Sequence, residues 1–340
     1  MKRIAVAVPI RVRNTSVILL LAMVAAVLAV VNIGIGAVPM SIADIWHAFT
    51  GQGDPDLSHI IIHYRMPRIL LALLVGSALA VSGLIAQTIL LNPLAAPDTL
   101  GISSGAAIGA VLLMVSLQPE WQSYGLSSIA AFAGGSLGAM LVYALAYRNG
   151  LNPVRLGLVG VAVSACGSTL VQLLVIHSSM NTNTVLLWLN GSLWGQTWAQ
   201  VSQLGPIVLL LIPVAWVLGT HLDILHLGDI SSKGLGMRVE LVRFFYLFLA
   251  VLLTSSSIAV VGMIGFVGLG SPHMARRMVR GGHRIYIPVA ALVGSIMLLL
   301  ADTLGRSVAP PIEFPAGLIT ALIGAPYFLY LLRREFRRQR

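Results

Sequence analysis

Long apolar runs recur along this chain between short polar connections, and they constrain the fold more than any other feature. A helix needs about 20 apolar residues to cross the hydrocarbon core of a bilayer, and runs of that length repeat from residue 16 to residue 332. Charged residues make up only 9% of the chain, against about 25% in soluble globular proteins. The sequence therefore predicts an all-α polytopic membrane protein and excludes a soluble multi-domain enzyme of this length.

Ten transmembrane spans are expected within one membrane domain that covers residues 1–340. Residues Thr254–Ser257 would form a very short turn between the seventh and eighth spans. The basic N-terminus and the apolar run after it have the layout of a signal peptide, but no A-x-A cleavage site follows, which favours a retained first helix. The predicted spans are 16–36, 66–90, 99–117, 126–147, 155–177, 199–219, 241–257, 258–279, 285–303 and 314–332.

Basic residues predict the orientation of these spans. With both termini in the cytoplasm, all but three of the 21 Lys and Arg residues lie on the cytoplasmic side, as the positive-inside rule requires. This asymmetry explains the net charge of +10 without a nucleic-acid partner. The three exceptions are Arg65, Arg68 and Arg306, each at the outer mouth of a span. Snorkelling at a helix end would explain them, but arginines also pair with carboxylates in a bidentate manner, which would suit a soluble partner that presents Asp or Glu.

A polar stretch interrupts the apolar pattern at Leu222–Arg243. It predicts a short helix over Leu225–Lys233, a turn at 234–236 and a second helix that begins near Val239, because glycines favour a helix stop and a reversal. Asp229 and Lys233 are spaced for an i,i+4 ion pair. The stretch is either an ordinary solvated loop or a docking element for a soluble partner.

Several small or polar residues lie in or beside the spans and are candidates for the translocation path or for helix packing. Gln87 is a lone polar side chain, for which an interhelical hydrogen bond is favoured over contact with a substrate. Asn92 opens a stiff turn, residues 92–98, expected on the cytoplasmic side. Gly262, Gly265 and Gly268 predict an irregular eighth span that borders the central path, since irregular backbone at membrane depth needs cover from protein or a water-filled cavity.

Motifs for covalent chemistry are absent from the sequence. It contains no GxxxxGK[ST] and no HExxH motif, so we expect no catalytic site, no ATP site, no metal and no cofactor on this chain. No predicted span carries a central Asp, Glu, Lys or Arg, which disfavours a proton-coupled carrier. Sodium coupling through backbone carbonyls stays open, so a sodium-driven secondary transporter is the alternative from another class.

Six motifs, in order, resemble the permease subunits of the iron-siderophore and vitamin B12 (FecCD/BtuC-like) class of bacterial ABC importers. Small departures include Leu91, where the family often has a basic residue, and Ser231-Ser232, where small apolar residues are common. The motifs are RMPR (Arg65–Arg68), NPLAAPDTLGISSGA (Asn92–Ala106), LGDISSKGLGM (Leu227–Met237), GMIGFVGLGSPHMARR (Gly262–Arg277), ADTLGR (Ala301–Arg306) and EFPAGLITALIGAPYFLYLL (Glu313–Leu332).

The resemblance implies ten helices, with spans two to five and seven to ten as an inverted repeat, in the bacterial cytoplasmic membrane. It implies a second permease subunit, identical or a sister chain, and an extracytoplasmic binding protein whose acidic lobes pair with Arg65, Arg68 and Arg306. It also implies two cytoplasmic ATPase subunits that hold ATP and magnesium. Their docking residues would be Leu227, Gly228, Asp229, Ser232, Lys233, Gly234, Leu235 and Gly236.

The cargo that the resemblance implies is a ferric siderophore, moved as an intact iron chelate. Cobalamin and haem are the alternatives within the same class.

Overall fold

The computed structural model describes residues 10–36, 38, 40–116, 124–148, 150–177, 182–308 and 312–338. Lys2, Arg3 and Arg340, predicted to be cytoplasmic, lie outside these ranges. The regular elements of the described residues are all helical, as predicted. In chain order they are α1 (Ile10–Gly34), α2 (Ile42–Thr50), α3 (Pro55–Ile60), η1 (Ile61–Arg65), α4 (Met66–Ile89), η2 (Pro97–Leu100), α5 (Ile102–Ser116), α6 (Tyr124–Ala146), α7 (Pro153–His177), α8 (Thr182–Leu189), α9 (Trp198–Val217), α10 (Gly219–Leu225), α11 (Asp229–Gly234), α12 (Val239–Val261), α13 (Val267–Met278), α14 (His283–Ser307) and α15 (Ala316–Arg338).

Seven helices of the described chain are long and apolar enough to cross a membrane. Two shorter apolar helices, Ile102–Ser116 and Ala316–Tyr330, accompany them. The chain is therefore a multi-pass integral membrane protein. The seven long helices are Val12–Gly34, Pro55–Ile89, Gly125–Ala146, Pro153–His177, Trp198–Val217, Val239–Val261 and His283–Ser307.

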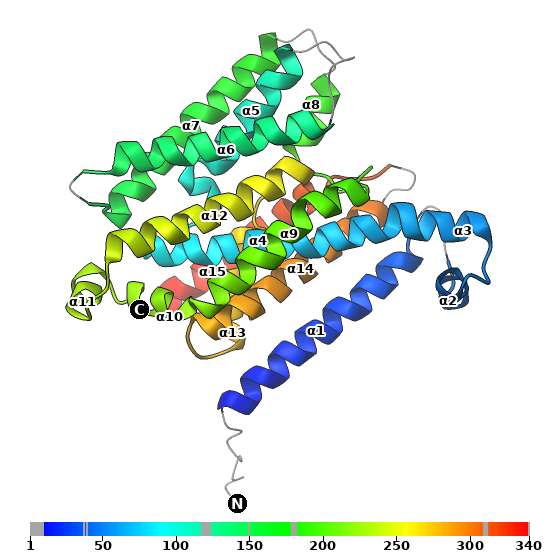
Figure 1. Ribbon diagram of the computed structural model, residues 1–340, viewed down its shortest axis with the longest axis horizontal. Helices are drawn as coiled ribbons and strands as arrows, with labels where there is room; N and C mark the ends of the chain where they lie inside the picture. The colour runs from blue at the N-terminus through cyan, green and yellow to red at the C-terminus, as the bar shows by residue number, and fades with distance from the viewer. Residues whose placement is uncertain are drawn as a thin grey trace, which may run out of the picture.

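Helix α4 lies at the centre of the bundle, where α9, α12, α13 and α14 pack around it (Figure 1). Most of its residues are buried. By contrast, α1, α6 and α7 expose large apolar side chains such as Leu19, Leu137 and Leu158. Apolar surface on this scale does not stay in contact with water in a soluble protein, so these faces are suited to lipid or to another membrane subunit.

The predicted turn at Thr254–Ser257 is wrong, because α12 continues through it to Val261. Two of the four hydroxyl groups of this segment, those of Thr254 and Ser257, are hydrogen-bonded inside the bundle, whereas those of Ser255 and Ser256 are buried without a hydrogen-bond partner among the described residues. Ser257 Oγ donates to the carbonyl of Leu253 at 2.7 Å, and Thr254 Oγ1 lies 2.6 Å from Ser82 Oγ on α4. The helix ends instead at Gly262, whose φ of 78° is strained for residues with a side chain.

The predicted helix Leu225–Lys233 is confirmed only from Asp229 onward, and its predicted start at Leu225 is wrong. Helix α10 ends at Leu225, and α11 begins only at Asp229 after Gly228 with a φ of 89°. The reversal predicted at 234–236 is confirmed, since α11 ends at Gly234 and Gly236 has a φ of 80°. Helix α12 begins at Val239, as predicted.

The short polar helices lie at opposite ends of the long ones (Figure 1). Helices α2 and α3 lie at one end, which we call the α2 end, and α10 and α11 lie at the other, the α11 end. Ser41 caps α2 by accepting from the backbone N–H of Asp44 at 3.2 Å, while the Asp44 carboxylate accepts from the backbone of Ser41 at 2.8 Å. This reciprocal arrangement is a capping box, and it stabilises the start of a helix whose Ile45 and Ala48 pack against Met40 and Ile61.

Candidate functional sites at the two ends of the bundle

The α11 loop, residues 226–238, presents large apolar side chains at its surface. Leu227, Ile230 and Leu235 are 60%, 90% and 65% exposed. Lys233 is exposed beside them, and open space surrounds the three loop glycines Gly228, Gly234 and Gly236. Exposed apolar residues that cluster on a polar loop are a common feature of protein-binding surfaces.

A buried arginine fastens this loop to the bundle. Arg243 of α12 pairs with Asp229 of α11 through Nη2 and Oδ1 at 2.5 Å. Its Nη1 also donates to the carbonyl of Leu151, between α6 and α7. The ion-pair partner of Asp229 is therefore Arg243 and not Lys233, which the i,i+4 spacing had predicted. The pairing joins α11, α12 and the α6–α7 connection at one point.

Ser232 forms the inner attachment of α11. Its side chain is buried and its Oγ contacts two carbonyl oxygens, those of Ile224 at 2.7 Å and Gly228 at 2.8 Å. Helices α10 and α11 are therefore bonded to each other as well as to α12. Of the predicted docking residues, Ser232 is therefore buried and holds α11 to α10, whereas Leu227, Lys233 and Leu235 are exposed to a partner.

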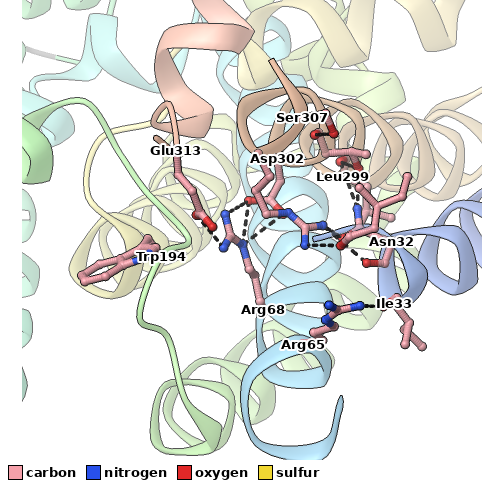
Figure 2. A network of polar contacts seen from close by, with 12 residues as sticks. Asn32, Ile33, Arg65, Arg68, Trp194, Leu299, Asp302, Ser307 and Glu313 are labelled. Atoms are coloured by element: carbon pink, nitrogen blue, oxygen red, sulfur yellow. Dashed lines mark hydrogen bonds and ion pairs between the residues drawn. The ribbon is translucent and has the colours of Figure 1, made fainter. Parts of the chain in front are cut away.

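The three arginines predicted at the outer side come together at the α2 end, and Figure 2 labels Arg65 and Arg68 together with the carboxylates Asp302 and Glu313. Arg68 bridges Asp302 and Glu313, with N–O distances of 2.8 Å to each. Arg306 approaches the other oxygen of Asp302 at 3.3 Å. Asp302 is buried and Glu313 is partly exposed. We call these five residues, including Arg65, the arginine cluster.

Arg65 and Arg306 also cap the end of α1. Arg65 donates to the carbonyls of Ile33 and Val38, and Arg306 donates to the carbonyl of Ile35 at 2.9 Å and to the side chain of Asn32. Carbonyls at the C-terminus of a helix lack intrahelical donors and carry partial negative charge. The two guanidinium groups therefore stabilise this helix end, and most of their surface is buried.

Asn32 is a contributor that the sequence analysis missed. It is buried in the first span, accepts from Arg306 and contacts Thr303 of α14. Its signal in the sequence is a lone amide at the end of a long apolar run. A polar side chain in that setting is costly unless it is hydrogen-bonded.

Gln87 makes the interhelical hydrogen bonds that were predicted for it. Its Nε2 donates to the carbonyl of Leu269 at 3.1 Å, and its Oε1 accepts from Arg276 at 2.7 Å. Asn92, in contrast, is exposed and bonds only locally among the contacts described, accepting from the backbone N–H of Leu94 at 2.9 Å. Gln87 thus joins α4 to α13, while Asn92 shapes the turn that follows α4.

The three glycines predicted to border the translocation path, Gly262, Gly265 and Gly268, differ in how closely they are packed. A Cβ on Gly262 would lie 2.1 Å from the carbonyl oxygen of Trp188, and one on Gly268 would lie 2.9 Å from Pro97 Cδ. These two glycines allow close backbone packing. Gly265 has open space where its side chain would be. Pro97 thus reaches the interior from the end of the turn at 92–98, whereas Asn92 at its start is exposed.

Comparisons with known proteins identify the family of this chain. The profile of the FecCD transport family matches residues 20–334. The Fe(3+)-citrate import system permease protein YfmE of Bacillus subtilis is 44% identical over 95% of this chain and 96% of its own length. The Fe(3+) dicitrate transport system permease protein FecD of Escherichia coli is 42% identical over 90% of this chain and 94% of its own length.

A solved structure of a metal-chelate type ABC transporter, in an inward-facing conformation, matches with a TM-score of 0.85 and 31% identity. The match covers 94% of this chain and 99% of that chain. The helical architecture and the sequence therefore lead to the same assignment. This chain belongs to the FecCD transport family.

Proposed function

We propose that this chain is the permease subunit of a binding-protein-dependent ABC importer, which moves a ferric chelate across the bacterial cytoplasmic membrane. The observation that carries the proposal is the α11 loop, where exposed apolar side chains lie on a segment bonded firmly to the bundle. The chain has no P-loop, so ATP and magnesium belong to partner ATPase subunits.

We propose ten membrane crossings, the seven long helices together with α5, α13 and α15. Helix α13 has 12 residues, which span about 18 Å at a rise of about 1.5 Å per residue, less than the bilayer core of about 30 Å. The non-helical residues 262–266 supply the remaining length on one side. A backbone of this kind is tolerated where other helices cover it, and Trp188 and Gly191 lie against it.

Helix packing supports an inverted repeat of α4–α7 and α12–α15. Helix α4 packs against α14, and α12 packs against α6. Each first helix therefore contacts the third helix of the other set, and the two first helices contact each other. Exchanging the two sets leaves these contacts unchanged, as an inverted repeat requires. Two permease subunits would then surround one path.

The α11 loop supports docking of two ATPase subunits, one on each permease. Leu227, Ile230 and Leu235 would form the apolar contact, and Lys233 a charged rim. Movement of the docked partner would reach α12 through Asp229 and Arg243. The chain itself performs no covalent step, and its helices rock between inward and outward access when the partners close on ATP.

The arginine cluster supports docking of a binding protein at the α2 end. Its five residues carry three positive and two negative charges, and Glu313 is its partly exposed carboxylate. An acidic side chain of the partner would compete with Glu313 for Arg68. Arg65 and Arg306, held on the end of α1, would act on the partner chiefly through their charge.

The cargo proposed is an iron(III) chelate. Both relatives described above are named as permeases for ferric citrate, and the matching structure is of the metal-chelate type. A path walled by Gly, Ala and other small residues suits a bulky complex that moves as one unit. Haem and cobalamin are the competing cargoes.

Co-purification and transport test this proposal together. The tagged chain should bring a soluble P-loop ATPase with it from native membranes, and proteoliposomes of the complex should take up radiolabelled ferric citrate only with the binding protein and ATP. Uptake driven by a sodium gradient, with no ATPase present, would replace the proposal with a secondary carrier.

A further inference from the structure

Three polar side chains from three helices form a line beneath the α11 loop. Asp223 lies on α10, His283 begins α14 and Thr88 lies in the last turn of α4. Asp223 Oδ1 accepts from the backbone N–H of His283 at 2.8 Å and lies 2.7 Å from His283 Nδ1. On the other side of the ring, Nε2 lies 2.8 Å from Thr88 Oγ1.

The line continues into the α11 loop through the adjacent residue. Ser232 of α11 donates to the carbonyl of Ile224, which follows Asp223 in α10. An unbroken series of bonds therefore runs from α11 through α10 and His283 to α4, the central helix. Next to Thr88, Gln87 extends it to Arg276 of α13.

Packing around the line leaves little freedom for Thr88 and His283, whereas the side chain of Asp223 is 39% exposed. Thr88 and His283 are buried. A Cβ on Gly282 would lie 2.4 Å from Asp223 Oδ2, so a side chain there would displace the carboxylate. A buried polar group is costly to leave unpaired, and each link therefore holds its neighbour in place.

The attachment through Arg243 ends on α12 and on the α6–α7 connection. The line through His283 ends on different helices, α4 and α14. A push on α11 that moved only α12 would shear it against α4, which packs beside it. Two attachments let one loop move both helices together.

We propose that Asp223, His283 and Thr88 are positioning residues that transmit movement of the docked ATPase from the α11 loop to α4 and α14. The inference rests on the proposed ATPase docking. It concerns the ratio of ATP hydrolysed to chelate transported, a quantity that docking alone does not determine.

The test uses the complete importer in proteoliposomes, with binding protein, ferric citrate and ATP. Thr88→Val removes the hydroxyl group and keeps the branched shape. His283→Asn keeps a donor toward Asp223 but cannot reach Thr88. Each variant should raise the ATP hydrolysed per chelate about five-fold, the effect of losing the one buried contact between Thr88 and His283. Thr88→Val also removes the bond to the carbonyl of Leu84, but that bond lies within α4 and links no second helix. The double variant should be no worse than either single one, because both break the same link.

Gly282→Ala is the second variant, because it keeps all three side chains and displaces only the Asp223 carboxylate. It should uncouple transport to a similar extent. His221→Ala is the matched control, because His221 is an exposed residue of α10, the helix that carries Asp223. The described contact of its ring is a local one, to the carbonyl of Leu218. It should keep the wild-type ratio.

Wild-type ratios in Thr88→Val and Gly282→Ala would overturn the inference, as would additive effects in the double variant. Poor assembly of one variant leaves the other to decide. Failure of the wild-type chain to bind an ATPase or to transport with ATP would instead overturn the proposed function, so the two failures are distinguishable.

Discussion

Arg243 and Asp229 form an ion pair with one buried and one accessible partner: the arginine side chain is 1% exposed and the aspartate side chain 32%. The guanidinium group belongs to a long helix, and the carboxylate belongs to the loop that carries the apolar patch. A partner that shifts the loop therefore acts directly on a charge held inside the bundle.

Replacing Arg243 should loosen the α11 loop. Arg243→Met keeps an apolar stem but removes the bonds to Asp229 and to the carbonyl of Leu151. We expect a loss of about 1–3 kcal/mol in the free energy of unfolding, with weaker retention of the ATPase subunit. Thermal unfolding in detergent and co-purification measure the two effects. Arg238→Met, at an exposed position of the same loop, is the control, and an equal effect of both variants would argue against a special role for Arg243.

Gly236 should be intolerant of proline. Its φ of 80° cannot be adopted by proline, whose ring fixes φ near −65°. We expect Gly236→Pro to distort the α11 loop, so that ATP hydrolysis no longer depends on the binding protein and chelate. Gly234→Ala is the matched control, because it lies in α11 with open space at its Cβ and alanine favours a helix. Chelate-stimulated hydrolysis that is unchanged in Gly236→Pro would contradict the proposed docking.

Glu313 should compete with the binding protein for Arg68. Glu313→Gln removes the exposed charge of the arginine cluster, while Asp302 still neutralises part of Arg68. We expect the binding protein to dissociate more slowly, with tighter binding that weakens at high salt. Surface plasmon resonance of the complex in nanodiscs measures this.

Arg68→Glu would place three carboxylates together and should weaken docking strongly. Because Arg68 also links α4 to Asp302, the stability of the Arg68→Glu variant must be measured by thermal unfolding together with its affinity for the binding protein. Binding-protein affinity that is the same in wild-type, Glu313→Gln and Arg68→Glu chains would exclude the cluster as the docking point.

Gly268 should be required for the contact between α4 and α13. A Cβ on Gly83 would lie 1.8 Å from the carbonyl oxygen of Gly268, and one on Gly268 would lie 3.0 Å from that of Leu79. Gly268→Ala should lower stability by about 1–3 kcal/mol through overpacking. Gly265→Ala, three residues away in open space, should leave the melting temperature unchanged. Equal melting temperatures of the two variants would contradict this packing.

The sequence predicted the membrane class and most of the long helices, because about 20 apolar residues in a row leave few alternatives. It also predicted the reversal at Gly236, since a glycine there satisfies a local backbone requirement. It failed at Thr254–Ser257, where the composition indicates a turn. Ser82 of α4 satisfies Thr254 across a distance of 172 residues in sequence, and a local pattern contains no sign of that partner.

The arginine cluster shows the same limit. The sequence identified Arg65, Arg68 and Arg306 from their placement against the positive-inside rule. It could not show that Asp302 and Glu313 neutralise Arg68, or that the end of α1 takes up the other two guanidinium groups. Those contacts depend on how α1, α4 and α14 pack. Docking at both ends of the molecule stays a prediction.

Reconstituted uptake tests the central claim most directly. Proteoliposomes would contain this chain with its second permease subunit, with or without the ATPase subunits, and radiolabelled ferric citrate would be supplied with the binding protein. We predict uptake only when the ATPase subunits and ATP are present, and none with a non-hydrolysable ATP analogue. Uptake at the same rate without the ATPase subunits would contradict the account.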